Sequence, residues 1–151
     1  MEDKLVKILA EKYEKKGCLT VEELVIPRQL HSKAFKKNSK RSYRRIDLAV
    51  YDPEKKLIIF IEAENGLWMQ HPVAYKELAN YTYLVSPVEE KKREYNGEQK
   101  TWAKKEGIGI IEINLLTEEV KETVSPQFNE LEKSIIELIY IRMAKAKNNR
   151  K

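Results

Sequence analysis

The sequence predicts a single α/β (α+β) domain in which helices flank a mixed central β-sheet. Three observations lead to this prediction. Residues 2–16 carry apolar side chains at helical spacing, residues 43–66 contain two apolar runs joined by a turn, and later apolar runs alternate with helical segments. A hairpin followed by strand–helix–strand units gives both antiparallel and parallel neighbours. The 151 residues are enough for one domain with a real core.

The N-terminal part begins with an amphipathic helix. One side of residues 2–16 is apolar, the other side carries lysine and glutamate, and Gly17 is a natural stop just beyond the end. Residues 20–30 leave two interpretations open. They form either a short strand that ends at Pro27 or a helical turn that begins at Thr20.

The hairpin is the segment around which the domain is organised. Residues 45–51 alternate and are rich in β-branched side chains, which predicts a strand. Residues 52–55 contain Asp and Pro, which favour a turn, and residues 57–61 are continuously apolar, as expected of a strand covered on both faces. A two-residue period means that the register of the pair decides which side chains meet.

Three carboxylates are expected at one end of this hairpin. If Tyr51 pairs with Ile58, then Asp47 lies opposite Glu62 on the same face, and Glu64 follows one pleat further along. Clustered carboxylates repel one another unless a cation compensates them, and Mg²⁺ prefers such oxygen ligands. The alternative is that Asp47 ends a strand beside Arg44 or Arg45 while the two glutamates lie in solvent.

After the hairpin the pattern alternates between helix and strand. The predicted elements are helix 73–81, strand 82–85, an exposed helix 88–106 interrupted near residues 96–97, strand 107–115, a small strand or loop 118–125, and helix 127–147. Residues 1–126 are therefore assigned to a core domain. Residues 127–151 are assigned to a C-terminal helix and basic tail. Because residues 135–143 are apolar on more than one side, we expect this helix to pack on the core or on the same helix of a homodimer.

Residues 28–45 form a basic segment with no Asp or Glu. Eight of its 18 residues are Lys or Arg, and the candidates for nucleic-acid contacts are Lys36, Lys37, Lys40, Arg41, Arg44 and Arg45. A block of one sign repels itself, and a phosphate backbone is the obvious compensating partner. A solubilising loop is the alternative. Because the block leads directly into the acidic hairpin, we favour nucleic acid as the partner.

Composition indicates the setting. The formal net charge is +5 and the pI about 9.1, which makes a polyanionic partner plausible. The single cysteine, Cys18, excludes an intramolecular disulfide and fits a reducing, cytoplasmic compartment. No apolar run approaches a membrane span and no signal peptide is expected. The surplus of Lys and Glu favours a thermophilic, archaeal source.

The acidic pattern resembles a known superfamily. Asp47, followed by an apolar strand and Glu62-Ala63-Glu64, is similar to the motif of PD-(D/E)xK nucleases. The resemblance implies a restriction-endonuclease-like αβββαβ core, which agrees with the predicted element order. It also implies that Asp47, Glu62 and the Ala63 carbonyl hold Mg²⁺ or Mn²⁺. An early-helix glutamate sometimes joins such a set, which makes Glu14 or Glu11 the candidate.

The sequence departs from this motif at its last position, where Glu64 replaces the lysine. A lysine there would position the attacking water and offset phosphate charge, whereas a glutamate is a metal ligand or a general base. The lysine of such sites also migrates to other positions, and Lys76 is the nearest candidate here. Gln70 is an accessory candidate for a hydrogen bond to ligand or phosphate.

These patterns predict a metal-dependent nuclease that hydrolyses DNA phosphodiester bonds, with Asp47, Glu62 and Glu64 as catalytic residues. A structure-specific, resolvase-like activity is one form of this prediction. The first alternative is a nuclease-fold protein that has lost catalysis and only binds nucleic acid. The second is a structural module that binds a partner through its C-terminal helix.

Overall fold

A computed structural model describes residues 2–27, 43–63, 76–88 and 97–149. The elements are α1 (Glu2–Lys15), β1 (Leu19–Pro27), β2 (Tyr43–Asp52), β3 (Leu57–Ala63), the 3₁₀ helix η2 (Lys76–Leu78), β4 (Tyr81–Pro87), α4 (Gly97–Glu106), β5 (Gly109–Ile113), β6 (Val120–Val124) and α5 (Lys133–Asn149). The fold is therefore an α/β domain with a mixed sheet, as predicted.

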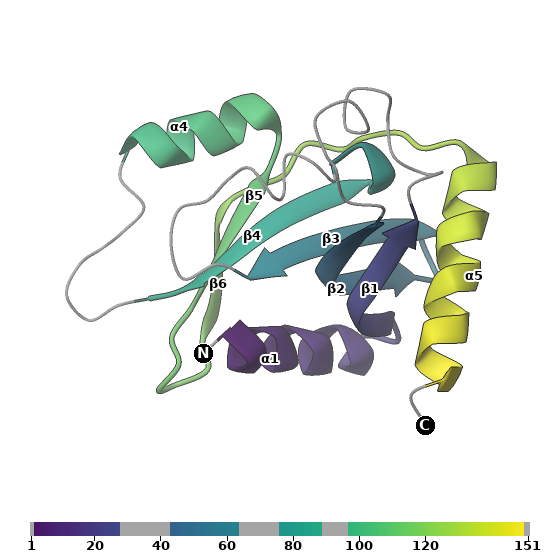
Figure 1. The fold of residues 1–151 in the computed structure, drawn as a ribbon. Coiled ribbons are helices and arrows are strands. Elements are labelled where there is room, and N and C mark those ends of the chain that lie inside the picture. Colours follow the sequence, from purple (N-terminus) through teal and green to yellow (C-terminus); the bar gives the residue numbers. More distant parts are fainter. Residues whose placement is uncertain (1, 28–42, 64–75, 89–96, 150–151) are drawn as a thin grey trace.

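In the described residues, six strands form one sheet in the order β1-β2-β3-β4-β5-β6 (Figure 1). Neighbours β1–β2, β2–β3 and β5–β6 are antiparallel, whereas β3–β4 and β4–β5 are parallel. Each parallel pair needs a crossover connection, and α4 supplies it between β4 and β5. The strand order follows the chain order throughout. Antiparallel and parallel neighbours both occur, so the predicted mixed sheet is confirmed.

The predicted hairpin register is confirmed, because Tyr51 pairs with Ile58. The turn also forms by the expected chemistry. Asp52 Oδ1 accepts hydrogen bonds from the N–H groups of Glu54 at 3.0 Å and Lys55 at 3.2 Å. Lys56 completes the reversal with a φ of 56°. Local turn residues therefore fix the register that brings Asp47 opposite Glu62.

Helices cover both faces of the sheet (Figure 1). On one face, α1 packs its apolar side against alternate residues of the central strands, including Leu48, Ile61 and Val85. On the other face, α5 inserts Ile139 and Met143 into the apolar layer of β1–β3, and α4 covers β5 and β6. The α1 prediction is confirmed, and α5 packs on the core.

Of the two interpretations left open for residues 20–30, the strand is confirmed in the described part, because β1 runs from Leu19 to Pro27. Other predicted boundaries are wrong. In the described part of predicted helix 73–81, only the single turn η2 is helical. The chain then leaves the helix because Asn80 uses its own N–H to bind the Ile58 carbonyl, at 2.9 Å. Within the helix predicted over residues 88–106, the helix that the structure describes is α4.

The C-terminal helix also begins later than predicted, at Lys133. The residues just before α5 do not join the helix, because two of their N–H groups bind the core. Gln127 donates to the Gly107 carbonyl at 2.9 Å and Asn129 to the Asn80 carbonyl at 2.8 Å. Residues 118–125, left open between strand and loop, contain strand β6. No helix in the described residues is long and apolar enough to cross a membrane.

Candidate functional site

Asp47 and Glu62 lie side by side where β2 and β3 separate. The last backbone pair of this ladder is Leu48 with Ile61. Beyond it, each carboxylate binds the main chain of the other strand. Asp47 Oδ2 accepts from the N–H of Ala63 at 2.9 Å, and Glu62 Oε1 accepts from the N–H of Asp47 at 3.4 Å. Hydrogen bonds from main-chain N–H groups to side-chain carboxylates thus take the place of backbone pairing here. They hold the two acids together at the end of the hairpin.

An irregularity in β1 and β2 explains why the ladder changes at Asp47. Leu48 packs in the layer under α1 whereas Ile46, two residues away, packs in the layer under α5. In a regular strand these side chains would share a face. In the neighbouring strand Glu23 has a φ of 56°, and the ladder lacks a Glu23–Asp47 pair while the register on either side stays the same. Such a distortion re-aims side chains, and here it sits at Asp47.

Glu62 is the buried member of the pair, with 3% of its surface exposed, whereas Asp47 is half-buried. Glu62 pairs with Leu84 of β4, on the sheet face opposite α1. A buried carboxylate is costly unless donors or a cation compensate its charge. One compensation is the Asp47 N–H described above.

The donor set fits a hard divalent ion. Carboxylate oxygens are the ligands of Mg²⁺, which commonly uses one or two of them and completes its shell with water and substrate phosphate. Asp47 engages only Oδ2 with the described main chain, which leaves Oδ1 for a cation. Among the described residues, no group of three or more His, Cys, Asp or Glu side chains is close enough to hold a metal. Glu64 lies outside the described residues, so the predicted third carboxylate does too.

Ala63 contributes its N–H to the Asp47 carboxylate. The resemblance assigned its carbonyl to the metal, and that assignment stays a prediction.

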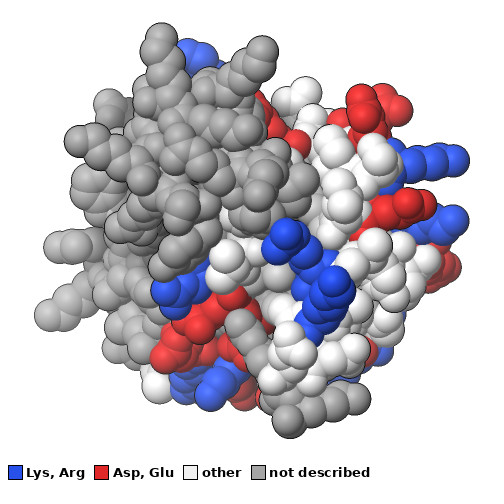
Figure 2. Space-filling model, turned by 45° about the vertical axis from the view of Figure 1, so that its right-hand side comes forward, with Lys and Arg blue, Asp and Glu red and all other residues white. Residues whose placement is uncertain are grey.

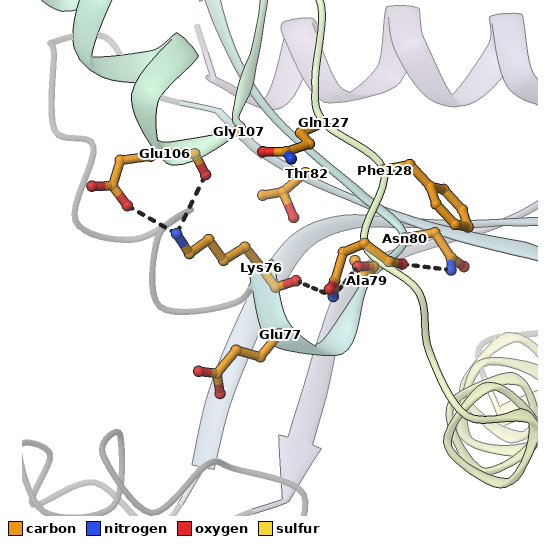
Figure 3. Close-up of a pocket in the computed structure, with 10 residues that line it drawn as sticks. Lys76, Glu77, Ala79, Asn80, Thr82, Glu106, Gly107, Gln127 and Phe128 are labelled. Atoms are coloured by element: carbon orange, nitrogen blue, oxygen red, sulfur yellow. Dashed lines mark hydrogen bonds and ion pairs between the residues drawn. The ribbon is translucent and has the colours of Figure 1, made fainter.

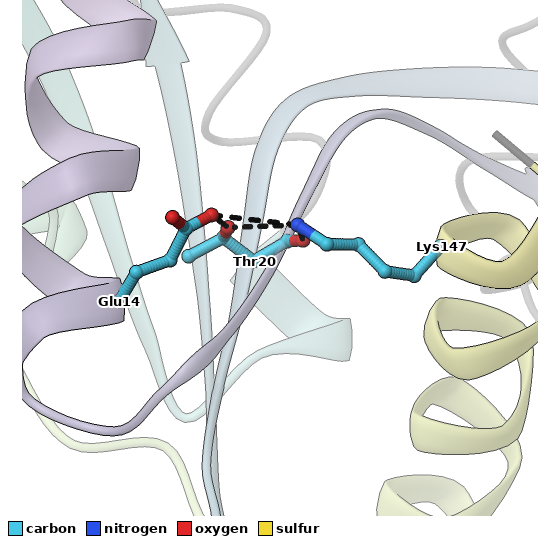
Figure 4. Close-up of polar contacts among 3 residues, drawn as sticks. All are labelled: Glu14, Thr20 and Lys147. Carbon is cyan, nitrogen blue, oxygen red and sulfur yellow. Dashed lines mark hydrogen bonds and ion pairs between the residues drawn. The ribbon is translucent and has the colours of Figure 1, made fainter. Parts of the chain in front are cut away.

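Glu14, the candidate from the first helix, forms a different cluster (Figure 4). Its Oε1 accepts a hydrogen bond from Thr20 Oγ1 at 2.5 Å and lies 3.4 Å from Lys147 Nζ. Lys147 also donates to the Thr20 carbonyl at 2.8 Å. The Thr20 hydrogen bond, together with Lys147, holds the pKa of Glu14 below its usual value, although burial partly opposes the shift. These contacts tie α1, β1 and α5 together, and Glu11 is exposed on α1.

Lys76, the candidate for the missing lysine, is paired with Glu106 (Figure 3). Its Nζ lies 2.9 Å from Glu106 Oε2 and 3.3 Å from the Glu106 carbonyl oxygen. Both residues line a pocket of about 250 Å³ together with η2, the end of α4 and residues 127–129. The structure therefore places Lys76 in an ion pair at that pocket. The other accessory candidate, Gln70, lies outside the described residues.

Most of the basic segment also lies outside the described residues, including Lys36, Lys37, Lys40 and Arg41. Arg44 is in β2, where its backbone pairs with Ile26. The exposed Arg45 side chain lies 3.3 Å from Glu23 Oε1, so part of its charge is already balanced. On the face shown in Figure 2, the described basic and acidic side chains are interspersed among other surface.

Sequence reasoning missed two buried polar residues at the start of β4. Asn80 is 2% exposed, and its side chain accepts from Ile58 N–H at 2.8 Å and donates to the Asn129 carbonyl at 3.0 Å. Thr82 is equally buried and lines the pocket, and its hydroxyl has no hydrogen-bond partner within the described structure. The available signal was a pair of polar residues at the entry to an apolar strand.

Comparisons with known proteins support the fold and leave the activity open. No family model matches the chain, and no curated protein matches it. A solved structure of a protein of unknown function from Silicibacter pomeroyi is similar, with a TM-score of 0.66 and 15% sequence identity. The match covers 97% of this chain and 85% of that chain. The similarity shows a shared α/β fold.

Proposed function

We propose that this protein is a metal-dependent nuclease that hydrolyses DNA phosphodiester bonds at Asp47 and Glu62. The observation that carries the proposal is the side-by-side placement of these two acids, each fixed by a hydrogen bond to the main chain of the neighbouring strand. A held pair of carboxylates on rigid strands is the support that a divalent ion requires. Mg²⁺ or Mn²⁺ is the proposed ion and DNA the proposed substrate.

The residues of this chain would divide the work as follows. Asp47 and Glu62 would hold the ion, and Ala63 would keep the Asp47 carboxylate oriented through its N–H. A bound divalent ion supplies an activated water and neutralises charge at the scissile phosphate. The basic segment 28–45 would bind the backbone without reading the sequence, because phosphate contacts carry no base information.

The replacement of lysine by Glu64 favours one alternative, a protein of this fold that binds DNA without cutting it. The pairing of Lys76 with Glu106 also supports this alternative, because that ammonium is already engaged. A resolvase-like activity would need two such centres, one for each strand that is cut.

A cleavage assay tests the proposal. Supercoiled plasmid, linear duplex, single-stranded DNA and a four-way junction are incubated with Mg²⁺, Mn²⁺ or EDTA. The variants are Asp47→Asn and Glu62→Gln, which remove the charge but keep an oxygen for the observed hydrogen bonds. Glu54→Gln, in the exposed turn of the same hairpin, is the matched control.

We expect metal-dependent cutting that both site variants lose by at least about 100-fold and the control retains. Salt-sensitive DNA binding without cutting would identify the binding-only alternative. Neither cutting nor binding would favour the partner-binding module. Cutting that survives both site substitutions would show that the chemistry lies elsewhere.

A further inference from the structure

The outward side of α5 carries an exposed stripe with coiled-coil spacing. Its members lie alternately four and three residues apart and are all exposed: Ser134, Leu138, Ile141, Lys145 and Asn148. Leu138 and Ile141 form its centre, with 49% and 48% of their surfaces exposed. The opposite side of the helix is buried against the sheet through Ile139 and Met143. The stripe therefore faces away from the core. Helix α5 itself lies at the edge of the molecule (Figure 1).

Two charged residues flank this stripe on opposite sides. Glu137 and Arg142 are five residues apart, which places them about 140° from each other around the helix and on either side of the apolar centre. Neither has a salt-bridge partner within the described part of the chain. In a heptad with Leu138 and Ile141 at the a and d positions, they occupy g and e, the positions that select partners in paired helices.

We propose that α5 pairs with α5 of a second copy of this chain, in parallel orientation about a two-fold axis. The charges select both the partner and the direction. In a parallel pair, the side of one helix that carries Glu137 lies next to the side of the other helix that carries Arg142. Glu137 then lies beside Arg142 of the partner subunit, and the two-fold axis repeats this contact once more. In an antiparallel pair, the side that carries Glu137 lies next to the same side of the other helix, and the same is true of Arg142. Each charge would then lie beside a charge of the same sign. A second copy therefore complements both charges, whereas a partner with charges of one sign would complement only one of them.

Burial of the apolar centre would drive the association of the two helices, and Lys145 would weaken it. Leu138 and Ile141 would each meet their own copy across the axis and lose their remaining exposure to water. Lys145 would also approach its copy, which costs stability, but its long side chain can extend toward solvent. We expect a reversible dimer, and this inference is independent of the chemistry at Asp47 and Glu62.

Sedimentation equilibrium over a range of protein concentrations measures the association. Leu138→Lys should weaken the dimer by roughly tenfold or more, because two half-exposed leucines lose their burial. Glu137→Arg and Arg142→Glu should each weaken it by about tenfold, since each change affects two ion pairs. The variant with both charge reversals should restore wild-type association. Lys104→Glu, on exposed α4, is the control.

Cysteine cross-linking tests the direction. In a Cys18→Ser background, Ser134→Cys should form a disulfide between subunits on mild oxidation, because parallel helices place residue 134 beside its own copy. In the corresponding antiparallel pair, position 134 would lie level with position 145, roughly 16 Å from its copy along the axis, too far for a disulfide. A monomer at all concentrations, a dimer unaffected by Leu138→Lys, or failure of the double reversal to restore association would each overturn the proposal.

Discussion

Asn80 is expected to be the most sensitive polar position in the described structure. It is 2% exposed and joins three segments: its side chain accepts from Ile58 of β3 and donates to Asn129, which precedes α5. Asn129 in turn uses its amide to bind the carbonyls of Lys76 and Ala79. Asn80→Leu keeps a similar side-chain shape but removes the amide oxygen and nitrogen that make these two hydrogen bonds.

The expected cost follows from the groups left behind. Ile58 is fully buried, so its N–H would lose its partner without access to water, which costs about 1–3 kcal/mol. Loss of the bond to the Asn129 carbonyl costs roughly 0.5–1.5 kcal/mol more. The free energy of unfolding should therefore fall by about 2–4 kcal/mol, partly offset by the apolar surface that leucine buries.

Urea denaturation at neutral pH measures this change, with thermal unfolding as a second readout. Asn114→Leu is the matched control, because the Asn114 side chain also makes two hydrogen bonds to the main chain, accepting from Leu116 and Thr117, but near the surface. The control should lose only about 0.5–1 kcal/mol. If Asn80→Leu costs no more than Asn114→Leu, the role assigned to the buried amide is wrong.

Two further predictions concern the contacts around the sheet. The lowered pKa of Glu14 means that its ionised form stabilises the fold, so this contribution is present above the ordinary value of 4.5 and is lost as the pH falls through the lower folded-state value. Glu14→Gln should therefore reduce stability at neutral pH by less than about 1 kcal/mol, because the pair is half-exposed, and should converge with wild type in acid denaturation curves. Gly107→Ala should destabilise more than Gly17→Ala by about 1 kcal/mol in urea titrations: both have positive φ, but only at Gly107 would a Cβ meet Gln127, at 3.0 Å. Equal losses at the two glycines would show that the Gln127 contact is unimportant.

The sequence by itself determined the α/β class, the first helix and the hairpin register. Each depends on information carried by neighbouring residues: helical spacing for α1, and an Asp-Pro turn between apolar runs for β2 and β3. Once Tyr51 pairs with Ile58, the pleat places Asp47 opposite Glu62, and the observed hydrogen bonds agree with this placement.

Only the tertiary structure decided the features that depend on distant segments. The helix expected over residues 73–81 is reduced in its described part to one turn, because Asn80 binds residues 22 and 49 positions away. Glu14, a candidate metal ligand by position, is held by Thr20 and by Lys147 from the other end of the chain. Local patterns carry the spacing of apolar residues, but hydrogen-bond partners brought together by folding leave no periodic signal. For that reason the sequence determined the strands that carry the acids, and the fold decided which polar groups they meet.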